Sequence, residues 1–211
     1  MLENKKILII QTAYIGDVIL ATSLVEVLKE KFPSIHLDFL LKKGSENILE
    51  NSPHIRKVHI WDKSKKKYTN LISMIKRVRA ERYDIILNLQ RFFNSGLISI
   101  LARSRYVVGF DKNPLSFFYS KRVLHQIPYR FGTSYYHEVQ RNYKLIQFFV
   151  GDKIPDAKSI KPKLYFSLED NKVIKKINLE KKSYYILAPT SVWFTKQWSK
   201  NQWKKLAISL M

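Results

Sequence analysis

Short apolar runs alternate with segments of helical period through the first half of the chain. Residues 5–10 predict a strand, residues 11–17 a small and polar loop, and residues 18–32 a helix that Pro33 ends. Apolar side chains in this helix recur at helical spacing and form one wide stripe: Val18, Leu20, Ala21, Leu24, Val25, Leu28 and Phe32. The opening segment is therefore predicted to be a strand, a loop and an amphipathic helix.

The alternation continues to residue 110. Further strands are predicted at residues 36–41, 57–61, 83–89 and 106–110, with helices between them near residues 44–53, 71–79 and 95–102. Strands that alternate with helices in sequence favour an α/β fold, in which helices cover both faces of a parallel sheet. Residues 111–134 are aromatic and basic without a clear period, and residues 135–150 predict one more helix.

A polar linker with Pro155 and Pro162 separates this block from a shorter second one. The second block is predicted to hold a helix near residues 169–177, a strand at 184–188 and a helix from about Ser199. A lone strand and two helices cannot bury their apolar faces unaided. We therefore expect a complete N-terminal domain at residues 1–160 and an incomplete second domain at residues 161–211.

The composition narrows the class of protein. With 211 residues, 45% of them apolar, the chain can bury a core, and no apolar run has the roughly 20 residues of a membrane-spanning helix. We expect a cytoplasmic protein. The absence of cysteine excludes disulfides and a thiol nucleophile. The 38 basic and 17 acidic residues give a net charge of +21, which favours anionic partners: nucleic acid, an anionic membrane surface or phosphorylated substrates.

The loop at residues 11–17 occupies the position where α/β sheets bind ligands, after the first strand and before the first helix. It lacks both the three-glycine dinucleotide fingerprint and the Gly-Lys-Ser/Thr of a phosphate loop, which disfavours these two chemistries. Asp17 at the start of the helix has two interpretations. It is an N-cap, or it is a general base whose ionised form the helix N-terminus favours.

Six segments together resemble the bacterial ADP-heptose:lipopolysaccharide heptosyltransferases, glycosyltransferase family 9. They are residues 6–24, 83–90, 94–96, 109–110, 137–141 and 190–198. The first reads KILIIQTAYIGDVILATSL and the last TSVWFTKQW. Their order and spacing cover the whole chain. Arg91 departs from the family pattern, because a glycine often follows the glutamine at that point.

The resemblance implies a GT-B type fold, two Rossmann-like lobes with parallel sheets, of which the C-terminal lobe is truncated here. It implies transfer of a heptose or related sugar from an ADP-sugar, with inversion, to a lipopolysaccharide core or other lipid-linked saccharide. Neither a cofactor nor a metal ion is expected. The implied location is cytoplasmic, with peripheral contact to the anionic inner membrane, and no nucleic-acid partner is implied.

The resemblance also implies roles for individual residues. Asp17 would take the proton of the acceptor hydroxyl, and Lys196 would stabilise charge on the leaving ADP. Thr190 and Ser191 would bind phosphate oxygens of the donor. The residues implied in acceptor binding are Thr12, Gly16, Gln90, His137 and Arg141.

Other interpretations stay open at the level of sequence. Lys196 could be an ordinary surface lysine, and His137 and Arg141, four residues apart on one predicted helix face, could bind an acidic acceptor or pair with neighbouring carboxylates. Trp193 and Trp198 suit packing better than stacking on adenine. The competing functions are a non-catalytic basic module that binds nucleic acid or an anionic membrane, and an inactive truncated relative. No nucleic-acid recognition motif is evident in the sequence.

Overall fold

The computed structural model describes residues 2–64, 66–125, 137–151, 153–176, 184–191 and 193–210. The chain divides into two compact units, Met1–Tyr165 and Phe166–Met211, which are described separately. The segment that leads to Tyr165 belongs with the first unit, because the Tyr165 hydroxyl donates to Glu26 and the backbone N–H of Lys163 donates to Thr22. None of the described helices combines the length and apolar character needed to cross a bilayer.

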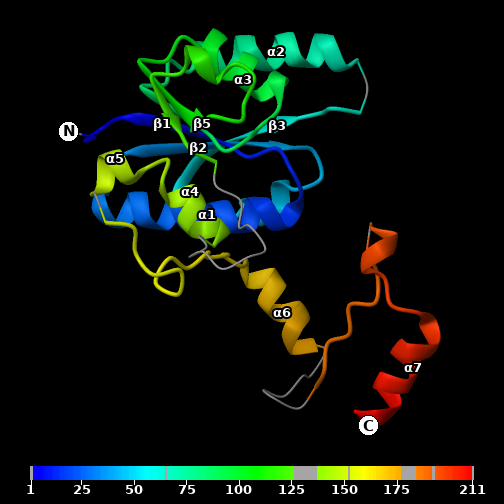
Figure 1. Ribbon diagram of the computed structural model, residues 1–211. Coiled ribbons are helices and arrows are strands. Elements are labelled where there is room, and N and C mark those ends of the chain that lie inside the picture. The colour runs from blue at the N-terminus through cyan, green and yellow to red at the C-terminus, as the bar shows by residue number, and fades with distance from the viewer. Residues whose placement is uncertain are drawn as a thin grey trace. The chain divides into compact units, whose positions relative to one another are not determined.

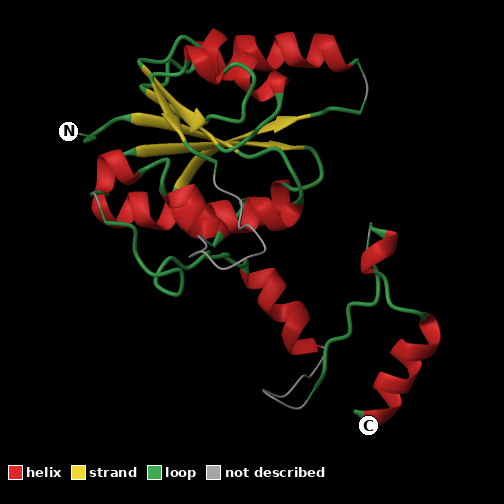
Figure 2. Ribbon diagram, viewed as in Figure 1, coloured by secondary structure: helices red, strands yellow, loops and turns green. Residues whose placement is uncertain are grey.

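The first unit is built on a parallel sheet of six strands in the order β3-β2-β1-β4-β5-β6 (Figures 1 and 2). The strands are β1 Lys6–Ile10, β2 His36–Lys42, β3 Ile55–Trp61, β4 Ile85–Asn88, β5 Tyr106–Phe110 and β6 Lys121–Val123. The predicted parallel α/β sheet is thus confirmed over its first five strands. β6 was not predicted, because three residues with two exposed basic side chains carry no periodic signal.

Helices cover both faces of the sheet (Figure 1). One face carries α1 Ile15–Lys31, α4 Glu138–Tyr143 and α5 Gln147–Val150, and the other carries α2 Lys67–Ala80 and α3 Phe93–Leu101. Successive side chains of a strand point to opposite faces. Accordingly Ile7 and Ile9 of β1 join the core under α1, while Leu8 and Ile10 join the core under α2 and α3. β1 is apolar from Ile7 to Ile10, because both of its faces are buried there.

Helix α1 matches its prediction closely. Its buried residues include Val18, Ala21, Leu24, Val25 and Leu28, with the remaining predicted stripe positions partly buried against the same core. The helix ends at Lys31, just before Pro33, and the N–H of the next residue still bonds to the Leu28 carbonyl at 2.9 Å.

Two predicted helices differ from the structure. The helix expected near residues 44–53 is only the 3-10 turn η1, Glu46–Ile48. The described part of the helix expected at residues 135–150 is two short helices, α4 and α5, joined by a turn in which Leu145 and Ile146 are fully buried. Hydrogen bonds of the i to i+3 type close this turn and direct both side chains into the core.

The second unit contains α6 Leu168–Lys176, the 3-10 turn η3 Phe194–Lys196 and α7 Lys200–Ser209. The two predicted helices are present, and Ser199 caps α7 by accepting the N–H of Gln202 at 3.4 Å. The strand expected at residues 184–188 is wrong: these residues are exposed and form no ladder with any described residue. A strand needs a neighbour for its backbone groups, and the described part of this unit supplies none.

Candidate functional site

A cavity of about 600 Å³ opens at the carboxyl ends of β1, β2 and β4. The strand order turns back on itself between β1 and β4, and α/β sheets bind ligands at such a switch point. The lining residues come from the loops after the strands, the end of β2, the first turn of α1 and α4: Gln11, Thr12, Ala13, Tyr14, Asp17, Lys42, Lys63, Leu89, Gln90, Arg91, Phe92, His125, Glu138 and Arg141. The site is therefore polar and predominantly basic.

Asp17 lies in the first turn of α1 and lines the cavity. Its Oδ2 accepts the backbone N–H of Tyr14 at 3.1 Å. The N-cap residue is Tyr14, so the interpretation of Asp17 as the N-cap is wrong in detail: the carboxylate satisfies the helix start from the third helical position. This bond fixes the carboxylate beside the cavity, where the helix N-terminus favours negative charge.

Two glutamines from neighbouring strands form a polar part of the wall. Gln90 donates through Nε2 to Gln11 Oε1, and its backbone N–H donates to Asn88 Oδ1 at 2.9 Å. Gln90 is 4% exposed, and its Oε1 has no hydrogen-bond partner among the described residues. A buried acceptor of this kind normally has a partner. The Gln90 Oε1 is thus a buried acceptor without a described partner, in a residue that lines the cavity.

Lys63 forms part of the basic wall. Its Nζ donates to the carbonyl and hydroxyl oxygens of Thr12 at 3.1 and 2.9 Å, and it lies 4.5 Å from the ring centre of Trp61. Partial removal of the amine from water, and then the neighbouring Lys42 cation, lower the pKa of Lys63 to about 8. Lys63 thus holds Thr12 in place, and its ammonium group loses its proton at a lower pH than an ordinary lysine does.

Arg141 and His125 face the same space. Arg141 pairs with Glu138, and burial is the main cause that lowers its pKa, with Arg91 adding to the effect and Asp17 opposing it. Burial also lowers the pKa of His125 to about 4, helped by Arg141 and Arg91, so its imidazole is neutral at pH 7. His125 Nδ1 and Arg141 Nε have no hydrogen-bond partner in the part of the chain that the structure describes.

Four of the predicted acceptor-side residues line the one cavity: Thr12, Asp17, Gln90 and Arg141. Gly16 and His137 do not line it. His137 is the N-cap of α4 and accepts the N–H of Val139 through Nδ1 at 3.4 Å, so it precedes the helix and does not share a helix face with Arg141. The sequence left two interpretations of Arg141 open, binding of an acidic acceptor or pairing with a carboxylate. The structure shows the pairing, with Glu138, and Arg141 also lines the cavity.

Sequence reasoning missed Lys63 and His125. Lys63 comes two residues after β3, so the rule that ligands gather at the carboxyl ends of strands could have identified it. His125 follows the short strand β6, which the hydrophobic pattern does not reveal, and no signal in the sequence pointed to it. In the described ranges no three His, Asp or Glu side chains come together as metal ligands do.

The predicted donor-side residues lie in the second unit. Ser191 Oγ accepts the N–H of Trp193 at 3.2 Å, and the Ser191 carbonyl accepts Gln197 Nε2 at 2.6 Å, so the segment around η3 is held by its own hydrogen bonds. Thr190 is exposed, and Lys196 ends η3 just before α7. The two tryptophans differ: Trp193 is 58% exposed, while Trp198 packs edge-on against Trp203 at 5.5 Å.

The fold and the site define a class: a doubly wound α/β protein with a polar, basic cavity at the switch point of its sheet. Comparison with known families takes the assignment further. Residues 71–211 match the model of glycosyltransferase family 9 (heptosyltransferase), which is most of the chain. The chain belongs to this family.

Relatives and solved structures agree with this assignment. Lipopolysaccharide heptosyltransferase 3 of Escherichia coli K12 is 25% identical over 212 residues, covering 93% of this chain and 57% of that protein. The fold matches the family 9 glycosyltransferase of Veillonella parvula with a TM-score of 0.77 at 18% identity, over 100% of this chain and 61% of that one. The structure of the E. coli heptosyltransferase WaaC with ADP matches with a TM-score of 0.68 at 18% identity. The match covers 97% of this chain and 64% of the WaaC chain. The chain spans less than two thirds of the length of these proteins.

Proposed function

We propose that this chain is the acceptor-binding domain, with the beginning of the donor-binding domain, of a transferase that moves a heptose or related sugar from an ADP-sugar to a lipopolysaccharide core acceptor. Family membership and the curated heptosyltransferase relatives support this proposal. WaaC has been solved with ADP and with ADP-2-deoxy-2-fluoro heptose, which supports an ADP-sugar donor. The observation that carries the proposal is the Asp17 carboxylate, fixed at the wall of a basic cavity.

Asp17 is the proposed general base. It accepts the proton of the acceptor hydroxyl as that oxygen forms its bond to the anomeric carbon and the bond from this carbon to the diphosphate oxygen breaks. One displacement inverts the anomeric centre and releases ADP. The hydrogen bond from Tyr14 keeps the carboxylate in place, so less of its freedom is lost when the acceptor binds.

The cavity suits an acidic acceptor saccharide. Lys42, Lys63 and Arg91 line it, and none of the three forms an ion pair with a described residue. In our proposal these cations attract carboxylate or phosphate groups, while Thr12, Gln90 and Arg141 bind the sugar.

Gly16 and His137 have supporting roles in this proposal. Gly16 belongs to the same first turn as Asp17, and a side chain there would meet no described atom within 4 Å. His137 caps the helix that carries Arg141, so it positions that side chain indirectly.

The second unit supplies the donor side in our proposal. Lys196 places its ammonium on the diphosphate and stabilises the charge that develops on ADP, while Thr190 and Ser191 bind phosphate oxygens. A lysine in this role acts on the leaving group as a divalent ion would, so the proposal includes no metal ion. The protein would work in the cytoplasm at the inner membrane surface, where its lipid-linked acceptor lies.

The test is Asp17→Asn in the full-length enzyme. Asn keeps an oxygen for the Tyr14 N–H but accepts no proton, so transfer should fall by about 100-fold or more with donor affinity little changed. Glu46→Gln is the matched control, because Glu46 also accepts a backbone N–H, that of Gly44 at 2.6 Å, and does not line the cavity. A fully active Asp17→Asn enzyme with an unchanged melting temperature would remove Asp17 from the mechanism.

A further inference from the structure

His125 lines the cavity of about 600 Å³ and has no part in the proposed mechanism. It lies two residues after β6, and two hydrogen bonds attach this segment to the end of β5. The backbone N–H of Asp111 donates to the Val123 carbonyl at 2.9 Å, and the N–H of His125 donates to Asp111 Oδ1 at 2.8 Å. The imidazole packs edge-on against the Phe110 ring, with 4.8 Å between the ring centres. Contacts with β5 and the residue after it therefore fix His125 in the cavity wall.

The imidazole is buried, but its hydrogen bonds are incomplete. His125 is 9% exposed, and its Nδ1 has no partner among the described residues. Gln90, which lines the same cavity, has an unpartnered Oε1, as described above for its wall. Buried polar atoms are nearly always hydrogen-bonded, and leaving one without a partner costs free energy. Unpartnered buried atoms in two residues of one cavity wall point to a polar group of a ligand as their partner.

The surroundings of His125 keep its imidazole neutral. Burial is the main cause that lowers its pKa to about 4; the cations of Arg141 and Arg91 lower it further, and the Asp111 carboxylate acts in the opposite direction. A neutral imidazole has one N–H that donates and one bare nitrogen that accepts. His125 therefore gives this basic cavity a hydrogen-bonding group without adding a charge.

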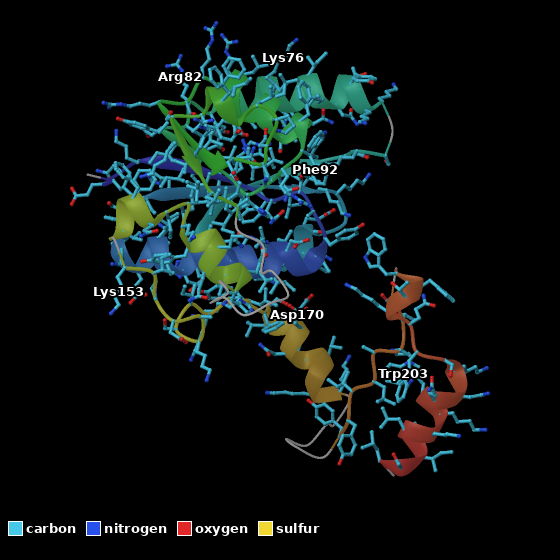
Figure 3. The ribbon with its side chains drawn as sticks, viewed as in Figure 1. Lys76, Arg82, Phe92, Lys153, Asp170 and Trp203 are labelled. Carbon is cyan, nitrogen blue, oxygen red and sulfur yellow. The ribbon has the colours of Figure 1, made fainter. Side chains whose placement is uncertain are left out.

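We propose that His125 is a specificity-determining residue that recognises an uncharged hydroxyl group of the acceptor saccharide. The inference rests on the proposed function and adds one contact to its acceptor. A hydroxyl both donates and accepts, so it can pair with Nδ1 in either tautomer of the ring. A carboxylate or phosphate would bind the neighbouring arginines instead. Phe92, which lines the same cavity, marks in Figure 3 the edge of the sheet where this contact lies.

The specificity comes from the cost of an unpaired group. An analogue without the recognised hydroxyl leaves the buried nitrogen of His125 without a partner, and sites built to bind a hydroxyl reject such analogues strongly. The cations of the cavity act differently, because their long-range attraction favours any acidic acceptor. We therefore expect His125 to distinguish acceptors that differ by a single hydroxyl.

Two other roles of His125 compete with this one. The ring could serve only to pack against Phe110, or the imidazole could take the acceptor proton in place of Asp17. Neither role depends on one particular hydroxyl beside the reacting one. Both predict that loss of the imidazole affects every acceptor alike, so kinetics with a series of acceptors separates them from recognition of a hydroxyl.

The experiment uses the full-length enzyme with ADP-heptose and a delipidated lipopolysaccharide core oligosaccharide, together with synthetic analogues that each lack one hydroxyl. His125→Phe keeps a ring against Phe110 but removes both nitrogens. The wild type should discriminate against one analogue by about 10- to 100-fold in kcat/KM, and His125→Phe should lose most of this discrimination. Its discrimination against the other analogues and its affinity for ADP should not change.

His125→Asn is the conservative variant, because its amide lies as far from Cβ as Nδ1 does, and it should restore part of the discrimination. His59→Gln is the matched control. His59 is also a buried histidine with an unpartnered Nδ1, but it does not line the cavity. The control should discriminate among acceptors as the wild type does, even where its stability is lower. Circular dichroism establishes that each variant is folded, and His125→Leu replaces the Phe variant if that one is not.

Two kinetic results would overturn the proposal: an equal loss of kcat/KM for every acceptor in His125→Phe, or discrimination in this variant equal to that of the wild type. Failure of the proposed function is distinguishable, because a wild-type enzyme that transfers no heptose to the oligosaccharide refutes that reaction before any variant is compared. Titration of the 211-residue chain with the same oligosaccharide, followed through the imidazole ¹⁵N signals, then tests the contact directly. A shift of the His125 Nδ1 signal that one analogue fails to produce supports the contact, and no shift overturns it.

Discussion

The Asp17 carboxylate has both a structural contact and a place at the cavity wall. It satisfies the start of α1 by accepting the Tyr14 N–H, and it lines the basic cavity. Lys63 also combines two features: it donates to Thr12, while burial and then the neighbouring Lys42 cation lower its pKa to about 8. At the scale of the residue, properties useful for chemistry here come from contacts that also stabilise the local backbone.

Lys196 supports a prediction at the same scale. In the full-length enzyme, Lys196→Ala should weaken ADP binding by about tenfold and also slow transfer, because a charge-assisted contact to the diphosphate is present in both ground and transition states. Calorimetric titration with ADP measures the first effect. Lys200→Ala, at the first position of α7, is the control and should bind ADP normally. Unchanged ADP affinity in Lys196→Ala would leave Lys196 as a surface lysine.

Among the elements, β5 and the segment before β6 approach each other closely at Gly109. A Cβ added at Gly109 of β5 would lie 2.5 Å from Tyr119 Cε2 and 3.1 Å from the Asn88 carbonyl oxygen. Tyr119 is buried and its hydroxyl bonds to Asn88 Nδ2 at 2.8 Å, so it cannot easily move away. The Gly-aromatic pair in the sequence, Gly109 and Phe110, therefore has a packing explanation.

Gly109→Ala should lower the free energy of unfolding by about 1–3 kcal/mol, the usual effect of overpacking. Urea denaturation followed by circular dichroism measures it. Gly16→Ala is the matched control, because an added Cβ there would meet no described atom within 4 Å, and its stability should be close to that of the wild type. Equal stability of both variants would show that Tyr119 relaxes at little cost.

On the scale of the first unit, a buried polar network lies between β2, β3 and the start of β4. Asp38, 1% exposed, accepts two bonds from Arg56 and one from the Tyr83 hydroxyl, and Tyr83 contacts His59 Nε2 at 2.8 Å. Burial and the Asp38 carboxylate raise the pKa of Tyr83, and burial lowers the pKa of His59 to about 4. The fold therefore favours a neutral imidazole at His59.

This network and His125 predict how stability depends on pH. A histidine with a folded pKa near 4, below its unfolded value of about 6.5, binds its proton more readily in the unfolded chain. Its contribution is complete above pH 6.5 and is lost as pH falls toward 4. Between pH 7.5 and 5, the preference of His59 for its neutral form should by itself lower the free energy of unfolding by on the order of 2 kcal/mol as the pH falls. Urea denaturation across this range measures the change.

The control for this prediction is His36→Gln, which replaces an exposed histidine at the start of β2 and should leave the pH dependence unchanged. Titration of Glu81 does not contribute between pH 7.5 and 5, because Lys57 and Arg56 lower the pKa of its carboxyl to about 2. Its contribution is lost only at lower pH. A flat profile from pH 7.5 to 5 would contradict the neutral, buried state of His59 and His125.

The candidate site was partly accessible from sequence. Asp17, Gln90 and Arg141 were identified from motif resemblance, and the structure brings all three to one cavity. Neither Lys63 nor His125 was identified. Lys63 follows the carboxyl end of β3, which the rule on strand ends could have indicated, whereas His125 follows β6, a strand without a periodic signal. The predicted placement of His137 and Arg141 on one helix face assumed a long helix, and α4 begins only after His137.

Periodicity by itself determined the first five strands, the three main helices that cover them and the class of fold. A helix buried on one face has apolar residues at helical spacing, and a strand buried on both faces has a continuous apolar run, so both can be identified from the order of residues. Only the tertiary structure decided the strand order, the sixth strand, the break between α4 and α5, and the gathering of Asp17, Lys63 and His125 at one cavity. These depend on contacts between residues far apart in the chain, which local pattern does not encode, because the energy that fixes them comes from packing and neighbouring charges.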